Sequence, residues 1–361
     1  MSFLKNIFGK KEEVVNSYET FWKWFQENEH KFFETVKNQR NIEKDFFDKL
    51  SPQLDKVKSE IYFLTGMADD NTVELIFTPD GIIKNIVFVE ELVAAAPKLS
   101  NWKFTALKPA TGKMGLHMGN YTFAEENLSF YPIIHENYPD EIDIVIAFDQ
   151  YREEDNGQIF NGIYIFLDNY LGELNTVTII DNLTVIAKDN AEQELIPMGK
   201  LKDYLIWREK EFVEQYVATK YDTENDSYSM LEAKLESGNM LLAVINTNLL
   251  NWDSKPSHPW MAKLILNYDG SETNGMPNES DYELLNAIED ELMESLVDVD
   301  GYLNVGRQTV KGEREIYFAC NDFRKPSKVF YEIQQKYKNV FEINISIFKD
   351  KYWQSLDQFK Q

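Results

Sequence analysis

Apolar residues recur at helical spacing over the first sixty positions of the chain. The first series carries an aromatic stripe that includes Phe21, Trp22, Phe25, Phe32 and Phe33. A second series spans residues 46–61, and positions three or four apart share one face of a helix, so both segments are predicted to be amphipathic helices. The stripe could line a ligand pocket or pack against a neighbouring element, and packing is the commoner use. Residues 1–59 are therefore predicted to form an N-terminal helical arm.

From residue 60 the apolar pattern changes, and segments of strand and helix type alternate. Two short apolar runs flank the turn-rich Asp69-Asp70-Asn71, which predicts a hairpin. Helical spacing, strand alternation, helical spacing and β character then follow one another up to residue 187. This order is typical of a split βαβ unit. Residues 60–217, which end in a further predicted helix, are predicted to form the first α+β domain.

A polar run at residues 218–227 is predicted to be a linker. Beyond it, after a leading hairpin, the same order of elements recurs over residues 228–361. The two halves predict an α+β fold of two split-βαβ, ferredoxin-like sandwiches. Their sheets are expected to be mainly antiparallel with helices on one face, and the helical arm precedes them.

The segment from Gly301 to Cys320 predicts a hairpin whose pairing assigns its side chains to two faces. A turn at Lys311-Gly312 would place Val305 opposite Phe318 and Leu303 opposite Cys320, which makes one face apolar. The other face is then expected to be polar and open.

A binding surface is predicted on this hairpin, consisting of Tyr317, Asn304, Gln308, Glu315, Arg307 and Arg314. Tyr317 lies opposite Gly306 in this pairing, so its ring would be uncovered and could anchor a partner. Two alternatives stay open. Tyr317 could be shielded by the N-terminal domain or by the tail around Trp353, and the arginines could simply neutralise Glu313 and Glu315.

The composition narrows the classes of partner. The net charge is −24 over 361 residues, which disfavours binding to the phosphates of nucleic acids. The single cysteine, Cys320, allows no intramolecular disulfide, is expected to be buried and inert, and suits a cytoplasmic location. No apolar run is long enough for a membrane span. The apolar stripe at residues 3–8 is short, so a docked or frayed terminus is favoured over peripheral membrane contact.

Motifs that carry chemistry are missing from the sequence. The glycines at 112, 115 and 119 match no phosphate-binding motif, and the chain has no Gly-x-Ser-x-Gly elbow. The four histidines, His30, His117, His135 and His258, are isolated in sequence. A metal site would have to be assembled from distant residues. No catalytic, cofactor-binding or metal-binding residue is therefore predicted.

Several short motifs in the C-terminal half occur together in a familiar order. They are Trp252-Asp253, Pro259-Trp260, Asn274-Gly275-Met276-Pro277, Ile288-Glu289-Asp290 and the segments 305–309, 312–318 and 350–353. Over about residues 228–355 the chain resembles the bacterial family called domain of unknown function 695. It departs from the family pattern at Ala319-Cys320, where an aromatic residue is usual. The resemblance implies a fold and no activity, because the family is uncharacterised.

Three functions are compatible with these observations. The first is a non-catalytic protein-interaction or regulatory module that holds another protein through open sheet faces or its acidic surface, and the lack of a catalytic motif favours it. The second is a hydrolase-like enzyme with a dispersed acid/base site in an interdomain cleft. The third is an acidic mimic of nucleic acid that inhibits a nuclease or toxin.

Overall fold

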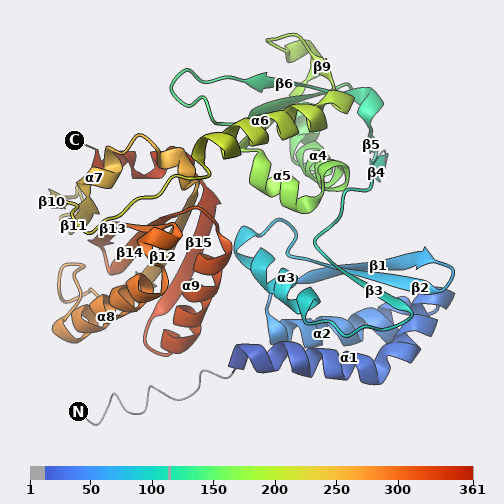
Figure 1. Ribbon diagram of the computed structural model, residues 1–361, viewed down its shortest axis with the longest axis horizontal. Helices are drawn as coiled ribbons and strands as arrows, with labels where there is room; N and C mark the ends of the chain where they lie inside the picture. Colours follow the sequence, from blue (N-terminus) through green and yellow to red (C-terminus); the bar gives the residue numbers. More distant parts are fainter. Residues whose placement is uncertain (1–12, 113–114, 361) are drawn as a thin grey trace. The chain divides into compact units, whose positions relative to one another are not determined.

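The computed structural model describes residues 13–112 and 115–360, so the apolar stripe at residues 3–8 lies outside the described residues. The chain divides into two compact units (Figure 1). The first consists of the residues up to 111 with 171–174, and the second of residues 112–170 with 175–361. Compactness does not test independent folding, so the domain boundaries expected after residues 59 and 217 stay predictions.

The first unit places helices against a three-stranded sheet. Its elements are α1 (Glu13–Asn38), a π-helical segment (Glu43–Phe47), α2 (Asp48–Val57), β1 (Tyr62–Asp69), β2 (Thr72–Thr78), α3 (Ile86–Ala94) and β3 (Trp102–Ala106). The strand order is β1-β2-β3, with β2 antiparallel to β1 and parallel to β3. The crossover through α3 makes the parallel pair possible.

The aromatic stripe of α1 packs on this sheet. The ring of Phe21 lies 6.1 Å from that of Phe77, and the ring of Trp22 lies 4.5 Å from that of Phe104. The packing interpretation of the stripe is therefore confirmed. The structure groups α1 and α2 with the sheet in one unit, whereas the sequence pattern predicted a separate arm.

The second unit begins with a small mixed region. Its elements are β4 (Leu116–Met118), β5 (Tyr121–Phe123), β6 (Leu128–Ile133), β7 (Asp143–Phe148), α4 (Asn156–Leu171), α5 (Glu173–Ile179), β8 (Asn182–Ala187), β9 (Ile196–Pro197) and α6 (Leu201–Tyr216). Strands β4 and β5 form a pair, and the others form a four-stranded sheet in the order β8-β7-β6-β9, with β7 parallel to β8.

The single split-βαβ sheet expected over residues 60–217 is therefore not formed. Its strands lie in separate sheets of three, two and four strands. In a split unit, a third strand lies between the two parallel strands that a helix connects. Here α3 returns the chain directly beside β2, and α4 with α5 returns it directly beside β7, so each crossover gives neighbouring parallel strands.

The rest of the second unit is one six-stranded antiparallel sheet with helices. Its elements are β10 (Tyr228–Lys234), β11 (Met240–Asn246), α7 (Thr247–Leu250), β12 (Trp260–Asn267), α8 (Glu279–Ser295), β13 (Tyr302–Val310), β14 (Glu313–Cys320), α9 (Arg324–Tyr337), β15 (Glu342–Lys349) and a 3₁₀ helix (Gln354–Phe359). The strand order is β10-β11-β13-β14-β12-β15. Contacts of Arg307 with Glu289 of α8 and of Phe318 with Phe330 of α9 place both helices on one face.

The register of the hairpin β13–β14 differs from the expected one. The turn at Lys311-Gly312 is confirmed, because both residues have positive φ and Val310 pairs with Glu313. Leu303, however, lies opposite Ala319 rather than Cys320, and a bulge between Asn304 and Gly306 shifts the pairing. One extra residue moves the following side chains to the opposite face. The expected pairing of Val305 with Phe318 is therefore wrong.

The expectation of a polar, open second face is also wrong for this hairpin. Leu303, Val305 and Tyr317 belong to a buried cluster with Leu249 of α7 and Trp353 of the C-terminal segment. The bulge puts the apolar residues of β13 on this side, and the chain after β15 returns to cover them. This sheet is thus apolar on both faces over its central strands.

In the part of the chain that the structure describes, no helix combines the length and the apolar character that crossing a membrane requires.

Candidate functional site

A group of polar side chains gathers where three strands of the second unit begin or end. Strands β7 and β8 run parallel, and Asp143 at the start of β7 pairs with Asn182 at the start of β8. The end of β15 brings Lys349 and, just beyond it, Lys351 to the same place, because both ammonium groups contact Asp181 at 2.9 Å.

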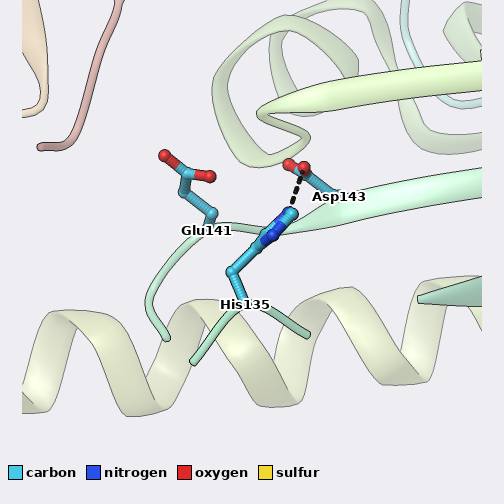
Figure 2. Close-up of side chains that lie close together, drawn as sticks. All are labelled: His135, Glu141 and Asp143. Atoms are coloured by element: carbon cyan, nitrogen blue, oxygen red, sulfur yellow. Dashed lines mark hydrogen bonds and ion pairs between the residues drawn. The ribbon is translucent and has the colours of Figure 1, made fainter. Parts of the chain in front are cut away.

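Three side chains in this region, those of His135, Glu141 and Asp143, lie close together (Figure 2). His135 Nε2 lies 2.8 Å from Asp143 Oδ2, and Glu141 offers a carboxylate oxygen within 4.8 Å of both groups. Glu141 and Asp143 are two positions apart in an extended segment, so they project to the same side, while Ile142 between them is buried. Among the described residues, this is the one group of three His, Cys, Asp or Glu side chains with such mutual proximity.

Hydrogen bonds orient both carboxylates of this triad. Asn182 Nδ2 donates to Asp143 Oδ1 at 2.8 Å, and Gln354 Nε2 donates to Glu141 Oε1 at 2.8 Å. Partial burial raises the pKa of Glu141, and the negative charges of Asp143 and Asp181 raise it further. His135 and Lys351 oppose that shift. The triad therefore concentrates negative charge in a partly desolvated place.

The lysines beside the triad are held by fixed partners. Lys349 Nζ also donates to Ile179 O at 3.0 Å, and Lys351 Nζ donates to Asp140 O at 2.6 Å. Burial lowers the pKa of Lys349 to about 8. Burial of Asp181 acts to raise its pKa, but the attraction of the two lysines outweighs it and the pKa is lowered. These contacts give the lysines a structural role in joining β15 to the residues around β8.

A second feature of this unit is the edge strand β10, which ends the six-stranded sheet (Figure 1). Met230 pairs with Val244, and Val244 pairs with Arg307, whose side chain meets α8. Residues opposite each other across a ladder share a face, so Met230 lies on the α8 side of the sheet. Met230 is nevertheless 69% exposed and Tyr228 is 47% exposed. On this side the helices cover the central strands of the sheet, whereas Tyr228 and Met230 of β10 form an exposed apolar strip.

Several acidic groups lie near Tyr228 in this strip. Partial burial raises the pKa of Tyr228, and Asp226, Glu289 and Asp298 raise it further through their negative charge. Glu232 lies on the same strand and is exposed. The hydroxyl of Tyr228 therefore lies in a negative electrostatic field.

The structure places the six residues of the predicted hairpin surface on two different faces. Tyr317, Gln308 and Glu315 lie on the side of the buried cluster, where Tyr317 is 4% exposed and its ring lies 5.9 Å from that of Phe359. The Tyr317 hydroxyl donates to Glu315, which also contacts Lys263 at 2.7 Å. The alternative in which the C-terminal tail shields Tyr317 matches this arrangement.

Asn304, Arg307 and Arg314 lie on the side of the helices. Arg307 contacts Glu289 of α8 at 2.6 Å, and Arg314, 2% exposed, donates to Asn286 Oδ1 at 2.9 Å. The two arginines therefore bind side chains of α8 and not those of the neighbouring Glu313 and Glu315. A binding role for the six residues stays a prediction. Sequence reasoning assigned no role to the triad, although the alternation of Glu141 and Asp143 with isoleucines was visible.

The comparisons with known proteins concern the C-terminal part of the chain. No curated protein and no solved structure matches the chain. The model of a family described as a family of unknown function, DUF695, matches residues 235–359. The resemblance inferred from the short motifs is therefore confirmed for this part, which runs from the end of β10 to the C-terminal 3₁₀ helix.

Proposed function

We propose that the chain is a non-catalytic protein-interaction module, and that β10 is where its partner binds. The partner presents an extended segment that contains Lys or Arg and pairs with the outer edge of β10. The observation that carries the proposal is the exposure of Tyr228 and Met230 on a strand that ends its sheet.

The backbone of an edge strand supplies the affinity in this kind of recognition. Among the described residues, β10 pairs only with β11, so one row of its backbone N–H and C=O groups faces away from the sheet. An added strand satisfies such groups, and side chains that alternate along it enter neighbouring surface pockets. Tyr228 and Met230 offer an aromatic and a flexible apolar contact for those side chains.

The charge of the chain supports a basic partner. The net charge is −24, and Asp226, Glu232 and Glu289 lie near the exposed strip. Complementary charge speeds association and fixes the register of a bound segment. A segment with Lys or Arg between apolar residues therefore fits β10 better than an acidic one.

We also propose a ferredoxin-like topology for residues 260–349. The order β12, α8, β13, β14, α9 and β15 along the chain, with the spatial order β13-β14-β12-β15, supports it. In this view β10 and β11 extend a split βαβ sandwich beyond its two helices. Because β10 lies beyond the part of the sheet that the two helices cover, its residues on the α8 side are exposed.

Selection of peptides tests this function. A library of random peptides is displayed against the full chain and against Met230→Lys, with Ile206→Lys as the matched control on the exposed side of α6. The proposal expects enriched peptides that alternate apolar and basic residues and that lose at least about tenfold in affinity for Met230→Lys, an effect of roughly 1.4 kcal/mol. Equal binding to all three proteins would overturn it.

A further inference from the structure

We infer that His135, Glu141 and Asp143 form a binding site for a divalent transition metal, with Zn²⁺ as the best match. The triad supplies one imidazole nitrogen and two carboxylate oxygens, and these atoms lie within 4.8 Å of one another (Figure 2). The site is separate from β10 and does not depend on the interaction proposed there.

The donor set favours zinc over magnesium or calcium. Zn²⁺ accepts nitrogen and oxygen ligands at about 2.0–2.2 Å, whereas Mg²⁺ and Ca²⁺ prefer oxygen alone. With bonds of that length, the ligand atoms of a tetrahedral zinc ion are about 3.3–3.5 Å apart. Binding therefore requires the carboxylate of Glu141 to move closer to the other two ligand atoms, which now lie within 4.8 Å of it.

A hydrogen bond joins two of the three ligand atoms. His135 Nε2 and Asp143 Oδ2 lie 2.8 Å apart, the distance of a hydrogen bond with one shared proton. A metal needs the lone pair of Nε2, so binding replaces this hydrogen bond by two coordinate bonds, and the ring proton is then on Nδ1.

The surrounding hydrogen bonds suit a metal site. Asn182 donates to Oδ1 of Asp143, so Oδ2 is left to turn towards His135. Gln354 donates to Oε1 of Glu141, so Oε2 remains available for an ion. Partners of this kind orient the ligands of known metal sites and raise their affinity.

The local charge balance favours a dication. Lys349 and Lys351 are close to the triad, but both contact Asp181 at 2.9 Å. The two carboxylates of the triad therefore keep negative charge that His135 and Lys351 offset only in part, because the pKa of Glu141 is still raised, and a divalent ion would neutralise this charge. The side chain of His135 is 35% exposed, so solvent can reach the ion and supply a fourth ligand.

The test uses the full chain after treatment with a chelator. Zn²⁺ is titrated calorimetrically, and Co²⁺ is used as an optical probe whose visible absorption reports a tetrahedral site. The inference expects one Zn²⁺ per chain and intense Co²⁺ bands, with affinity lowered at least about tenfold in His135→Gln and in Glu141→Gln. His117→Gln, a histidine outside the triad, is the matched control and is expected to bind like the unaltered chain.

Thermal unfolding without metal separates loss of the site from loss of the fold. Both triad variants are expected to unfold within a few degrees of the unaltered chain when metal is absent, and only the unaltered chain and His117→Gln are expected to gain stability when Zn²⁺ is added. If a variant unfolds early, Glu141→Ala replaces it, because Glu141 lies before β7 begins. Zinc binding that is absent, or that is equal in all variants, would overturn the inference.

Discussion

At the scale of single residues, His258 is a histidine that the fold keeps neutral. It is 1% exposed, its Nδ1 lies 2.8 Å from Ser257 Oγ, and its Nε2 has no hydrogen-bond partner among the described residues. Burial lowers its pKa from 6.5 to about 4. Protonation of this ring therefore opposes folding.

The pH dependence of stability follows from that shift. Between pH 6.5 and 4 the unfolded chain holds the proton more tightly than the folded chain, so stability falls as the pH falls through this window and is complete above it. The contribution of His258 is about 3 kcal/mol. Urea unfolding at pH 7.5 and 4.5 measures it, and His258→Gln is expected to lose most of the difference. An equal acid sensitivity of the variant would contradict this account.

Asp181 is the counter-ion of two buried lysines. Its carboxylate contacts Lys349 and Lys351, whose side chains are 9% and 1% exposed. Asp181→Asn leaves two buried cations without their counter-charge and is expected to cost about 3–5 kcal/mol of unfolding free energy. Lys349→Met keeps the pair with Lys351 and is expected to cost less than half as much. Chemical unfolding of both variants decides this, and equal losses would count against the assignment.

At the scale of elements, the bulge in β13 sets the two faces of the C-terminal sheet. Gly306 follows the bulge with φ of 138°, and a Cβ there would overlap Val244 O and lie 2.9 Å from Ile245 Cα. Only glycine accepts this combination of backbone angle and contact.

Gly306→Ala is therefore expected to lower the unfolding free energy by about 2 kcal/mol or more, because β11 or β13 must move. Gly66→Ala in β1 is the matched control, since a Cβ there meets no atom within 4 Å. The midpoints of thermal unfolding compare the two. A similar small change in both variants would show that the backbone at Gly306 relaxes freely.

Most elements of the C-terminal half could be predicted from the sequence, but the bulge in β13 could not. The spacing of apolar residues and the positions of turn residues predicted the hairpin turn at Lys311-Gly312 and the strands and helices of the C-terminal half. They could not reveal the bulge, because one extra residue leaves the apolar alternation of Leu303 and Val305 intact while moving both to the other face. The separate sheets of residues 60–217 escaped prediction because strand order depends on tertiary packing.

The candidate metal site was partly visible in the sequence. The positions of Glu141 and Asp143 follow from alternation, since both flank the buried Ile142. His135 reaches them through a loop, and loop paths are not encoded in periodicity. The exposure of the strip on β10 could not be predicted for a different reason. The sequence shows that Tyr228 and Met230 are apolar, but it does not show that α8 and α9 stop short of covering them.

At the scale of the whole molecule, charge and the extension of the C-terminal sheet support a role in binding another protein. The net charge of −24 favours a basic partner. The family match over residues 235–359 includes β11 to β15, so the sheet that β10 extends is the part shared with other proteins. The hydrolase-like and nucleic-acid-mimic alternatives stay predictions.

Amide hydrogen exchange with and without a selected basic peptide shows whether a partner segment pairs with β10. If β10 receives the peptide as an added strand, exchange of the backbone amides in Tyr228–Lys234 slows markedly on binding. Strand β1, one of the two edge strands in the sheet of the other unit, is the internal control and is expected to be unchanged, although its Tyr62 and Leu64 are also about half exposed. Protection that appears in β1 or α6 and not in β10 would contradict the account.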